Sequence, residues 1–271
     1  MAGPLTYRAV ADTARARAVA GTGSPFTIEV RFLGGLTEGQ RQAFRVAADR
    51  WSRIIVGDLP DATVGGETVD DVRIDARGVA IDGPAGVLGR AGPTQLRPAS
   101  AGASAYLPVT GTMEFDSADL AEMESGGTLD DVITHEMGHV LGFGTLWARK
   151  GLLAGAGTND PTYGGAGGVA EYAALRGRPD GAGVPVEDSG GQGTRDSHWR
   201  EAVFGAELMT GYVEQAANPL SRLTAAAMAD LGYQVDLDAA EPYTLPSPSA
   251  VRRRGHKRHA RPRGTDPTVL S

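Results

Sequence analysis

The fold is organised around one segment, Thr134-His135-Glu136-Met137-Gly138-His139-Val140-Leu141-Gly142-Phe143. Residues four apart share a helix face, so His135 and His139 can both reach one metal ion. Glu136 lies beside that ion, where a carboxylate can take a proton from a metal-bound water. This arrangement is typical of zinc hydrolases. The alternative interpretation is two surface histidines on an ordinary amphipathic helix.

The residues around this segment predict the helix itself. Thr128 and Asp131 predict an N-cap with a capping box, and Gly142 with Gly144 predicts the end of the helix. The apolar side chains cluster on one side, about 140° from the two histidines. We therefore expect one face to pack and the other to bind. The apolar residues are Leu129, Val132, Ile133, Met137, Val140 and Leu141.

Length and composition set the limits of the fold. The chain has 271 residues and is 41% hydrophobic, enough for one core, as one domain or as two subdomains around a cleft. It has no cysteine, so histidines and carboxylates must hold any zinc. Residues 1–24 lack the apolar core of a signal peptide, and no run of 18 apolar residues occurs. We therefore predict neither an export signal nor a transmembrane segment.

The charge is divided unevenly along the chain. The net charge is −7, yet seven Lys or Arg residues and no acid lie between Arg252 and Arg263. An acidic body with a basic tail is not typical of a nucleic-acid-binding domain, so no nucleic-acid partner is expected. A rival hypothesis gives this tail contacts with nucleic acid or an anionic surface. A solvated, disordered tail is the favoured interpretation.

The residues before the histidine segment alternate between strand and helix patterns. Together they predict an α+β chain (an α/β layer) with a mixed sheet and the metal helix beneath it. Residues 112–115 could form a sheet edge that pairs with an extended peptide, or an ordinary inner strand, and the sequence leaves both open. The predicted elements are a strand at 26–32, a helix at 37–57, a strand at 72–81 interrupted at Gly78, turns at 83–98, an extended segment at 106–115 and a short helix at 116–124.

The second half is rich in loops. Residues 151–194 contain 13 glycines in 44 residues, with a helical patch at 169–175. So long an irregular piece inside a domain is more often functional or linker-like than accidental. A helix at 221–231 and a strand at 233–237 follow. We expect four regions: a leader or short helix at 1–23, an N-terminal subdomain at 24–145, a C-terminal subdomain at 146–241, and a Pro-rich and basic disordered tail at 242–271.

Catalytic zinc usually has three protein ligands and a water, so one more ligand is needed. The chain has five histidines. His256 and His259 lie in the basic tail, which leaves His198 as the leading candidate. The competing choice is the carboxylate of Glu171. Met209 follows His198 and could form an apolar floor under the ligands, although a plain core position would also explain it.

These segments resemble the metzincin zinc peptidases, whose consensus is His-Glu-x-x-His-x-x-Gly-x-x-His. Thr145 stands where that consensus has its third histidine, and the leishmanolysin branch shows the same departure, with a long insertion before the third histidine. The resemblance extends over about residues 128–237. Its further segments are Val184-Pro185-Val186-Glu187, Gly190-Gly191-Gln192-Gly193-Thr194, Ser197-His198-Trp199, Glu207-Leu208-Met209-Thr210-Gly211 and Leu231-Gly232-Tyr233.

The resemblance implies a secreted or surface zinc endopeptidase acting on proteins or peptides, with a metzincin-like fold whose lower subdomain is rich in glycine and loops. His135, His139 and His198 would be the zinc ligands, Glu136 the general base and Met209 the methionine of the turn. Tyr212 could support the oxyanion. The cysteine-based latency of parasite leishmanolysins cannot apply to a chain without cysteine.

Two questions stay open at the level of sequence. A catalytically silent module, in which zinc is structural and the cleft holds a peptide without cutting it, is the rival function; an intact Glu136 argues against it. The acids of the Gly-rich loops, among them Asp160, Asp180 and Asp188, could bind calcium. Oligomeric state is not predicted.

Overall fold

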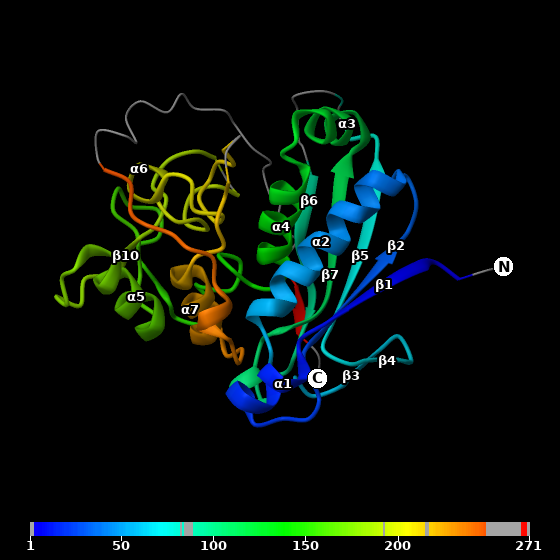
Figure 1. The fold of residues 1–271 in the computed structure, drawn as a ribbon, viewed down its shortest axis with the longest axis horizontal. Helices are drawn as coiled ribbons and strands as arrows, with labels where there is room; N and C mark the ends of the chain where they lie inside the picture. Colours follow the sequence, from blue (N-terminus) through cyan, green and yellow to red (C-terminus); the bar gives the residue numbers. More distant parts are fainter. Residues whose placement is uncertain are drawn as a thin grey trace.

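The computed structural model describes residues 3–81, 83, 89–191, 193–214, 217–247 and 267–269. A mixed sheet with two long helices forms the N-terminal part, and shorter elements gather beside it (Figure 1). The predicted α+β class and mixed sheet are therefore confirmed. No helix within these ranges is both long enough and apolar enough to span a membrane.

The main sheet has six strands in the order β1-β2-β5-β7-β6-β11. β2, β5 and β7 are parallel, whereas β1 and β6 run antiparallel to their neighbours β2 and β7. Ile28 and Val30 of β2 are fully buried, which confirms the predicted alternation there. The strands are β1 (Leu5–Val10), β2 (Thr27–Phe32), β5 (Val72–Val79), β6 (Gly89–Leu96), β7 (Pro108–Asp116) and β11 (Thr268–Val269).

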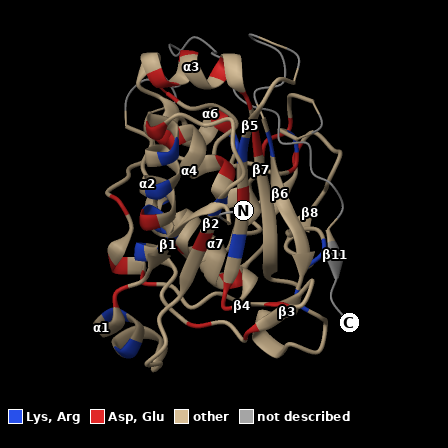
Figure 2. Cartoon of the chain, turned by 90° about the vertical axis from the view of Figure 1, so that its right-hand side faces the viewer, with Lys and Arg blue, Asp and Glu red and all other residues tan. Residues whose placement is uncertain are grey.

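Two helices, α2 (Glu38–Ile54) and α4 (Leu129–Val140), lie on the same side of this sheet (Figure 2). α2 begins at the predicted cap, because the Thr37 hydroxyl accepts from the Gln40 N–H (3.1 Å) and the Gln40 side chain accepts from the Thr37 N–H (3.0 Å). Trp51 of α2 is fully buried and donates its indole N–H to the carbonyl of Thr134 on α4 (2.8 Å). This contact ties the helix that carries both histidines to its neighbour.

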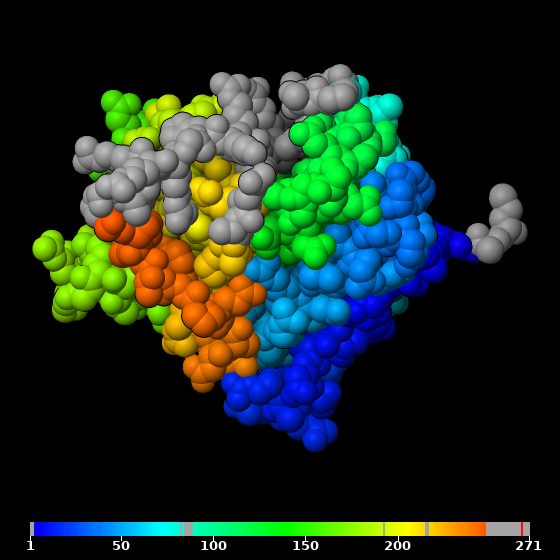
Figure 3. Space-filling view, turned by 45° about the horizontal axis from the view of Figure 1, so that its top comes forward, coloured from blue at the N-terminus to red at the C-terminus, as the bar shows by residue number. Residues whose placement is uncertain are grey.

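The remaining elements are short, and most follow α4 in the chain. The C-terminal part lies directly against the N-terminal helices (Figure 3). Arg50 of α2 joins the two parts, because it pairs with Asp131 of α4 (2.7 Å) and with Glu241 (2.6 Å). The other elements are α1 (Thr13–Arg15), η1 (Ala16–Ala20), β3 (Ala62–Val64), β4 (Glu67–Val69), η2 (Gly102–Ser104), α3 (Ser117–Gly126), β8 (Leu153–Ala154), β9 (Thr162–Tyr163), α5 (Ala166–Arg176), β10 (Val184–Pro185), α6 (Glu201–Phe204), α7 (Arg222–Leu231) and η3 (Leu237–Ala239).

The N-terminal segment agrees only in part with the prediction of a leader or short helix: residues 13–20 form the short helical elements α1 and η1, whereas residues 5–10 form a strand. β1 pairs with β2 along its whole length and forms one edge of the sheet. Leu5 and Val10 are exposed at this edge, so the segment lacks the clear alternation of a half-buried strand. Residues 5–10 form a strand because they pair with β2, although their own sequence does not predict one.

The prediction of turns at residues 83–98 is also wrong in its second half, where β6 forms. Gly92 and Pro93 are poor strand residues, and the register between β6 and β7 shifts just after Pro93. Because β6 covers the outer side of β7, residues 112–115 form an inner strand. β5 runs on through Gly78, which pairs with Phe115, so no break occurs there.

Two local predictions fail, one at the start of α4 and one after α7. Thr128 makes no side-chain cap on α4, and Asp131 instead binds Arg50 and the side chain of Asn218 (2.8 Å). Residues 233–237 form no strand; Val235 makes a single bridge with Ile55. Tertiary ion pairs and contacts override these weak local signals.

The Pro-rich segment is not disordered at its start. Residues 242–247 pack on the core, and the Tyr243 hydroxyl donates to the carbonyl of Phe204 (2.5 Å). β11 then pairs parallel with the end of β6. The basic segment from Arg252 to Arg263 lies outside the described residues.

Candidate metal centre

Three imidazole rings meet at one point beside α4. The Nε2 atoms of His135, His139 and His198 lie 3.0–3.1 Å from one another. All three side chains are buried. His135 and His139 lie one turn apart on α4, whereas His198 lies 59 residues beyond His139. The fold therefore brings together the three histidines that the sequence singled out.

His198 reaches the site through a close approach between two loops. Its carbonyl accepts from the N–H of Glu187 (2.9 Å), which holds the His198 segment against the loop before it. The chain leaving α4 passes Ser197 at Gly144, where φ is +71° and a Cβ would lie 2.1 Å from the Ser197 carbonyl oxygen. Only glycine permits both this conformation and this contact. The residue after Ser197 is thereby placed next to His139.

The second nitrogen of each ring determines the tautomer. Each Nδ1 lies within hydrogen-bonding distance of a main-chain carbonyl: Leu208 for His135 (2.8 Å), Phe143 for His139 (2.9 Å) and Thr194 for His198 (2.9 Å). A carbonyl only accepts, so each Nδ1 carries the proton and each Nε2 presents a lone pair. The short Nε2–Nε2 approaches are therefore not hydrogen bonds. Three lone pairs that face one another in a buried site repel one another, and a bound cation would relieve this repulsion.

The electrostatics favour neutral rings. Burial, together with the smaller effect of a neighbouring imidazole, lowers the pKa of His139 and of His198 to about 3. Neutral imidazole is the form that binds zinc. With zinc–nitrogen bonds of about 2.0–2.1 Å, tetrahedral ligand nitrogens stand about 3.3 Å apart. The observed triangle is slightly smaller, so a small outward movement of the rings fits it to this ion.

Glu136 is the unpaired acid of the centre. Its side chain is 1% exposed, and within the described residues its Oε2 has no hydrogen-bond partner. Burial raises its pKa to about 8 in the metal-free chain. A buried carboxylate oxygen without a partner costs free energy, and a cation or a water in the site would relieve that cost.

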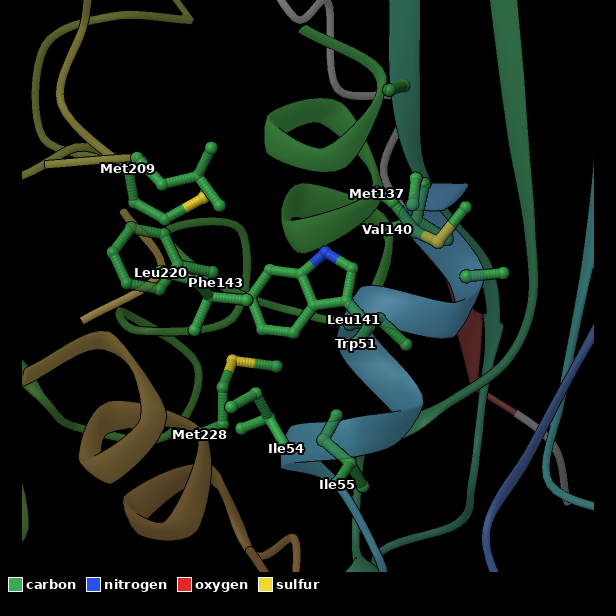
Figure 4. Packing of buried hydrophobic residues seen from close by; sticks show 14 of the residues in the cluster. Trp51, Ile54, Ile55, Met137, Val140, Leu141, Phe143, Met209, Leu220 and Met228 are labelled. Atoms are coloured by element: carbon green, nitrogen blue, oxygen red, sulfur yellow. The ribbon is translucent and has the colours of Figure 1, made fainter. Parts of the chain in front are cut away.

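Met209 lies against α4, the helix that carries His135 and His139. It is fully buried, and it sits in a turn closed by the Thr210 N–H donating to the carbonyl of Glu207 (3.2 Å). A Cβ added to Gly138 would lie 2.9 Å from both the Sδ and the Cε atoms of Met209. Figure 4 shows Met209 on the side of Trp51 away from Met137. Met209 is thus a core residue that also contacts the metal helix.

Replacing Gly138 by alanine is expected to destabilise the protein by about 1–2 kcal/mol. The new methyl group would lie 2.8 Å from the Trp51 ring, which its hydrogen bond to Thr134 prevents from moving. This overpacking exceeds the helix propensity that alanine gains, about 1 kcal/mol. Urea unfolding measures the change. Gly126→Ala at the end of α3, where nothing lies within 4 Å, is the matched control and should be neutral or stabilising; equal effects at both positions would contradict the prediction.

Several residues considered from sequence lie outside this centre. Glu171, the alternative third ligand, pairs with Arg222 (3.3 Å). Asp160 and Asp188 lie near Arg200, and Asp180 pairs with Arg176. Within the described ranges none of these loop acids belongs to a group of three or more acids or histidines that could share a metal ion. Tyr212 is a separate case: it follows the Met209 turn, its carbonyl accepts from the Thr210 hydroxyl (3.1 Å), and the role of its side chain at the oxyanion stays a prediction.

Sequence reasoning missed one cluster of three aspartates and one buried glutamate. Asp58, Asp70 and Asp71 gather within 4.8 Å at the end of the sheet. Asp71 already accepts from Thr27 and Leu59, and Asp70 pairs with Arg8. The second is the buried Glu207, which the sequence shows only as an acid before an apolar Leu-Met pair. That signal, a charged residue directly before the methionine turn, could have identified it.

Comparison with known families agrees with the geometry. The family model described as leishmanolysin, a peptidase family, matches residues 103–247, which is more than half of the 271 residues. This range includes α4, His198 and Met209. No curated protein sequence matches the chain.

Proposed function

Because the chain belongs to the leishmanolysin family of metallopeptidases, we propose that it is a zinc-dependent endopeptidase. The observation that carries the proposal is the convergence of three neutral imidazoles on one point, with Glu136 directly after the first of them. Protein substrates follow from the family.

His135, His139 and His198 would hold the zinc. Their Nδ1–H groups are engaged by carbonyls, so the rings cannot rotate freely and their Nε2 lone pairs are available. Once bound there, zinc would supply Lewis acidity, polarising the scissile carbonyl and acidifying a water. The chain offers no cysteine that could close the shell instead.

Glu136 would act as the general base. Within the described residues its Oε2 has no partner, so it is available to take the proton of the attacking water and pass it to the leaving amine. Burial makes Glu136 a stronger base than an exposed glutamate, and a nearby cation would keep it ionised at neutral pH. Water attacks directly, so no acyl-enzyme is required.

The arrangement of the chain supports a metzincin-like division around the site. The sheet, α2 and α4 fall in residues 24–145, apart from β1 and β11, whereas His198 and Met209 come from residues 146–241. The active centre would then lie where the two subdomains meet. The catalytically silent alternative gives no account of the buried, unpaired Glu136.

Removal of the metal is expected to abolish peptide hydrolysis reversibly. The purified protein should contain one zinc per chain and cleave a denatured protein such as casein. A chelator such as 1,10-phenanthroline should stop cleavage, because the three histidines alone supply no Lewis acid, and zinc should restore it. Metal analysis and fragment release measure both effects. A protein that holds one zinc and never cleaves a denatured chain would instead be a binding module.

A further inference from the structure

Glu207 is a fully buried carboxylate immediately before the methionine turn. Its Oε1 accepts from the hydroxyls of Ser221 (2.6 Å) and Thr224 (2.5 Å), and its Oε2 accepts from the N–H of Met209 (2.6 Å). The Ser221 N–H adds a longer bond (3.3 Å). The proposed mechanism makes no use of this acid.

The Met209 N–H belongs to the same peptide group as the Leu208 carbonyl. That carbonyl accepts from the Nδ1–H of His135 (2.8 Å). The two hydrogen bonds therefore form one chain, from the carboxylate through the peptide group to the imidazole. A carboxylate on the N–H side of a peptide polarises it and makes its carbonyl a stronger acceptor. A stronger acceptor at Nδ1 raises the basicity of Nε2 and holds the ring in one orientation.

We propose that Glu207 is a positioning residue that acts on His135 through the peptide group between Leu208 and Met209. The inference rests on the proposed zinc site. It gives that site a negatively charged carboxylate, Glu207, that does not touch any of the three histidine ligands directly. Glu207 takes the part that a carboxylate bonded directly to a ligand histidine plays elsewhere, with one peptide group between them.

The donors around Glu207 are arranged for the ionised form. The Met209 N–H can only donate, which leaves no room for a proton on Oε2. Trp199 donates its indole N–H to the Thr224 hydroxyl (2.9 Å), so that hydroxyl must direct its own proton to Glu207. Burial raises the pKa of Glu207 above its usual value, and the four hydrogen-bond donors from Ser221, Thr224 and Met209 lower it only in part. The paired donors offset much of the cost of burying the charge.

The same network reaches the other side of the centre. Trp199 directly follows His198, and its main-chain N–H donates to the carbonyl of Met209 (3.0 Å). Thr224 links Trp199 to Glu207 through its hydroxyl. One carboxylate on the inner side of the site therefore ties the turn behind His135 to the residue after His198.

Glu207→Gln tests the charge while nearly keeping the shape. We expect zinc affinity, measured by competition with a chelator of known affinity, to fall by about 10- to 100-fold, as for other residues that support a metal ligand. Asp71→Asn is the matched control, because Asp71 is as buried and also accepts from main-chain N–H groups and a threonine hydroxyl. A purely structural role for Glu207 would lower the stability of both metal-free variants and leave both zinc affinities unchanged, which would overturn the proposal.

Nuclear magnetic resonance of the metal-free protein provides a readout independent of activity. The His135 Nδ1–H resonance should shift upfield in Glu207→Gln, although residue 207 does not touch His135; an unchanged resonance would refute the relay. If that variant does not fold, the unmutated protein provides the test. A Met209 amide proton with an ordinary chemical shift in that protein would also refute the relay from Glu207 to His135. If the unmutated protein bound no zinc, the proposed function itself would be wrong. If it bound zinc and Glu207→Gln had no effect on zinc affinity, only the role of Glu207 would be wrong.

Discussion

His198→Ala is expected to lose zinc and, with it, all measurable peptide hydrolysis. His198 supplies one of three lone pairs at the centre, and its ring fills a buried site that alanine leaves open. Loss of a direct ligand should weaken zinc binding by more than about 100-fold, the upper range for residues that act only through a ligand. Metal analysis after dialysis, together with hydrolysis of a denatured protein, measures both.

The control for His198→Ala is a variant of Glu171, the alternative third ligand considered in the sequence analysis. Glu171→Gln should leave zinc content and cleavage unchanged, because Glu171 pairs with Arg222 on the surface of α5 and α7. Retention of one tightly bound zinc in His198→Ala, with loss of zinc in Glu171→Gln, would reverse the assignment. Far-ultraviolet circular dichroism should confirm that both variants keep their helices.

Glu136→Gln is expected to keep zinc and lose turnover. The amide has nearly the shape of the carboxylate but cannot accept the proton of the attacking water, so the rate should fall by about 100- to 10,000-fold. Zinc affinity should stay close to that of the parent, since the three imidazoles are untouched. Parallel measurement of zinc content and initial rate separates this outcome from loss of the metal. A variant that cleaves as fast as the parent would remove Glu136 from the mechanism.

The metal-free form of the same variant checks that its inactivity does not come from misfolding. Burial raises the pKa of Glu136 from 4.5 to about 8, so the folded state binds the proton more tightly than the unfolded state. The stability due to this proton is fully present below pH 4.5 and is lost as pH rises through 8. Glutamine does not titrate, so metal-free Glu136→Gln should gain stability over the metal-free parent as pH rises from 5 to 8. Urea unfolding at the two pH values measures the gain, and no gain would contradict it.

Two helix ends were predicted correctly from neighbouring residues alone. α2 begins at the capping box of Thr37 and Gln40, and α7 ends at Gly232 in the left-handed conformation. Both signals act between residues at most four positions apart, so they can form without a contribution from distant residues. Thr128 at α4 fails by the same measure, because Asp131 finds a stronger partner in Arg50.

β6 is a strand that its own sequence did not predict. Its Gly92 and Pro93 resemble turn residues, and they form a strand because β7 offers a complementary edge. Leu5–Val10 pairs with β2 in the same way at the other side of the sheet. Strand formation depends on a partner that lies far away in the chain, and its own residues carry only part of that information.

Local sequence was enough to predict the helix with its two histidines and Glu136, because a four-residue spacing becomes a common face in any α-helix. It also restricted the third histidine to His198 by elimination. Three features could be seen only in the folded chain: the three Nε2 atoms meet, carbonyls from three loops set the tautomers of the rings, and Glu207 is linked to His135 through one peptide group. These features depend on loop closure over tens of residues, whose outcome is set by packing of the whole chain and by no local pattern.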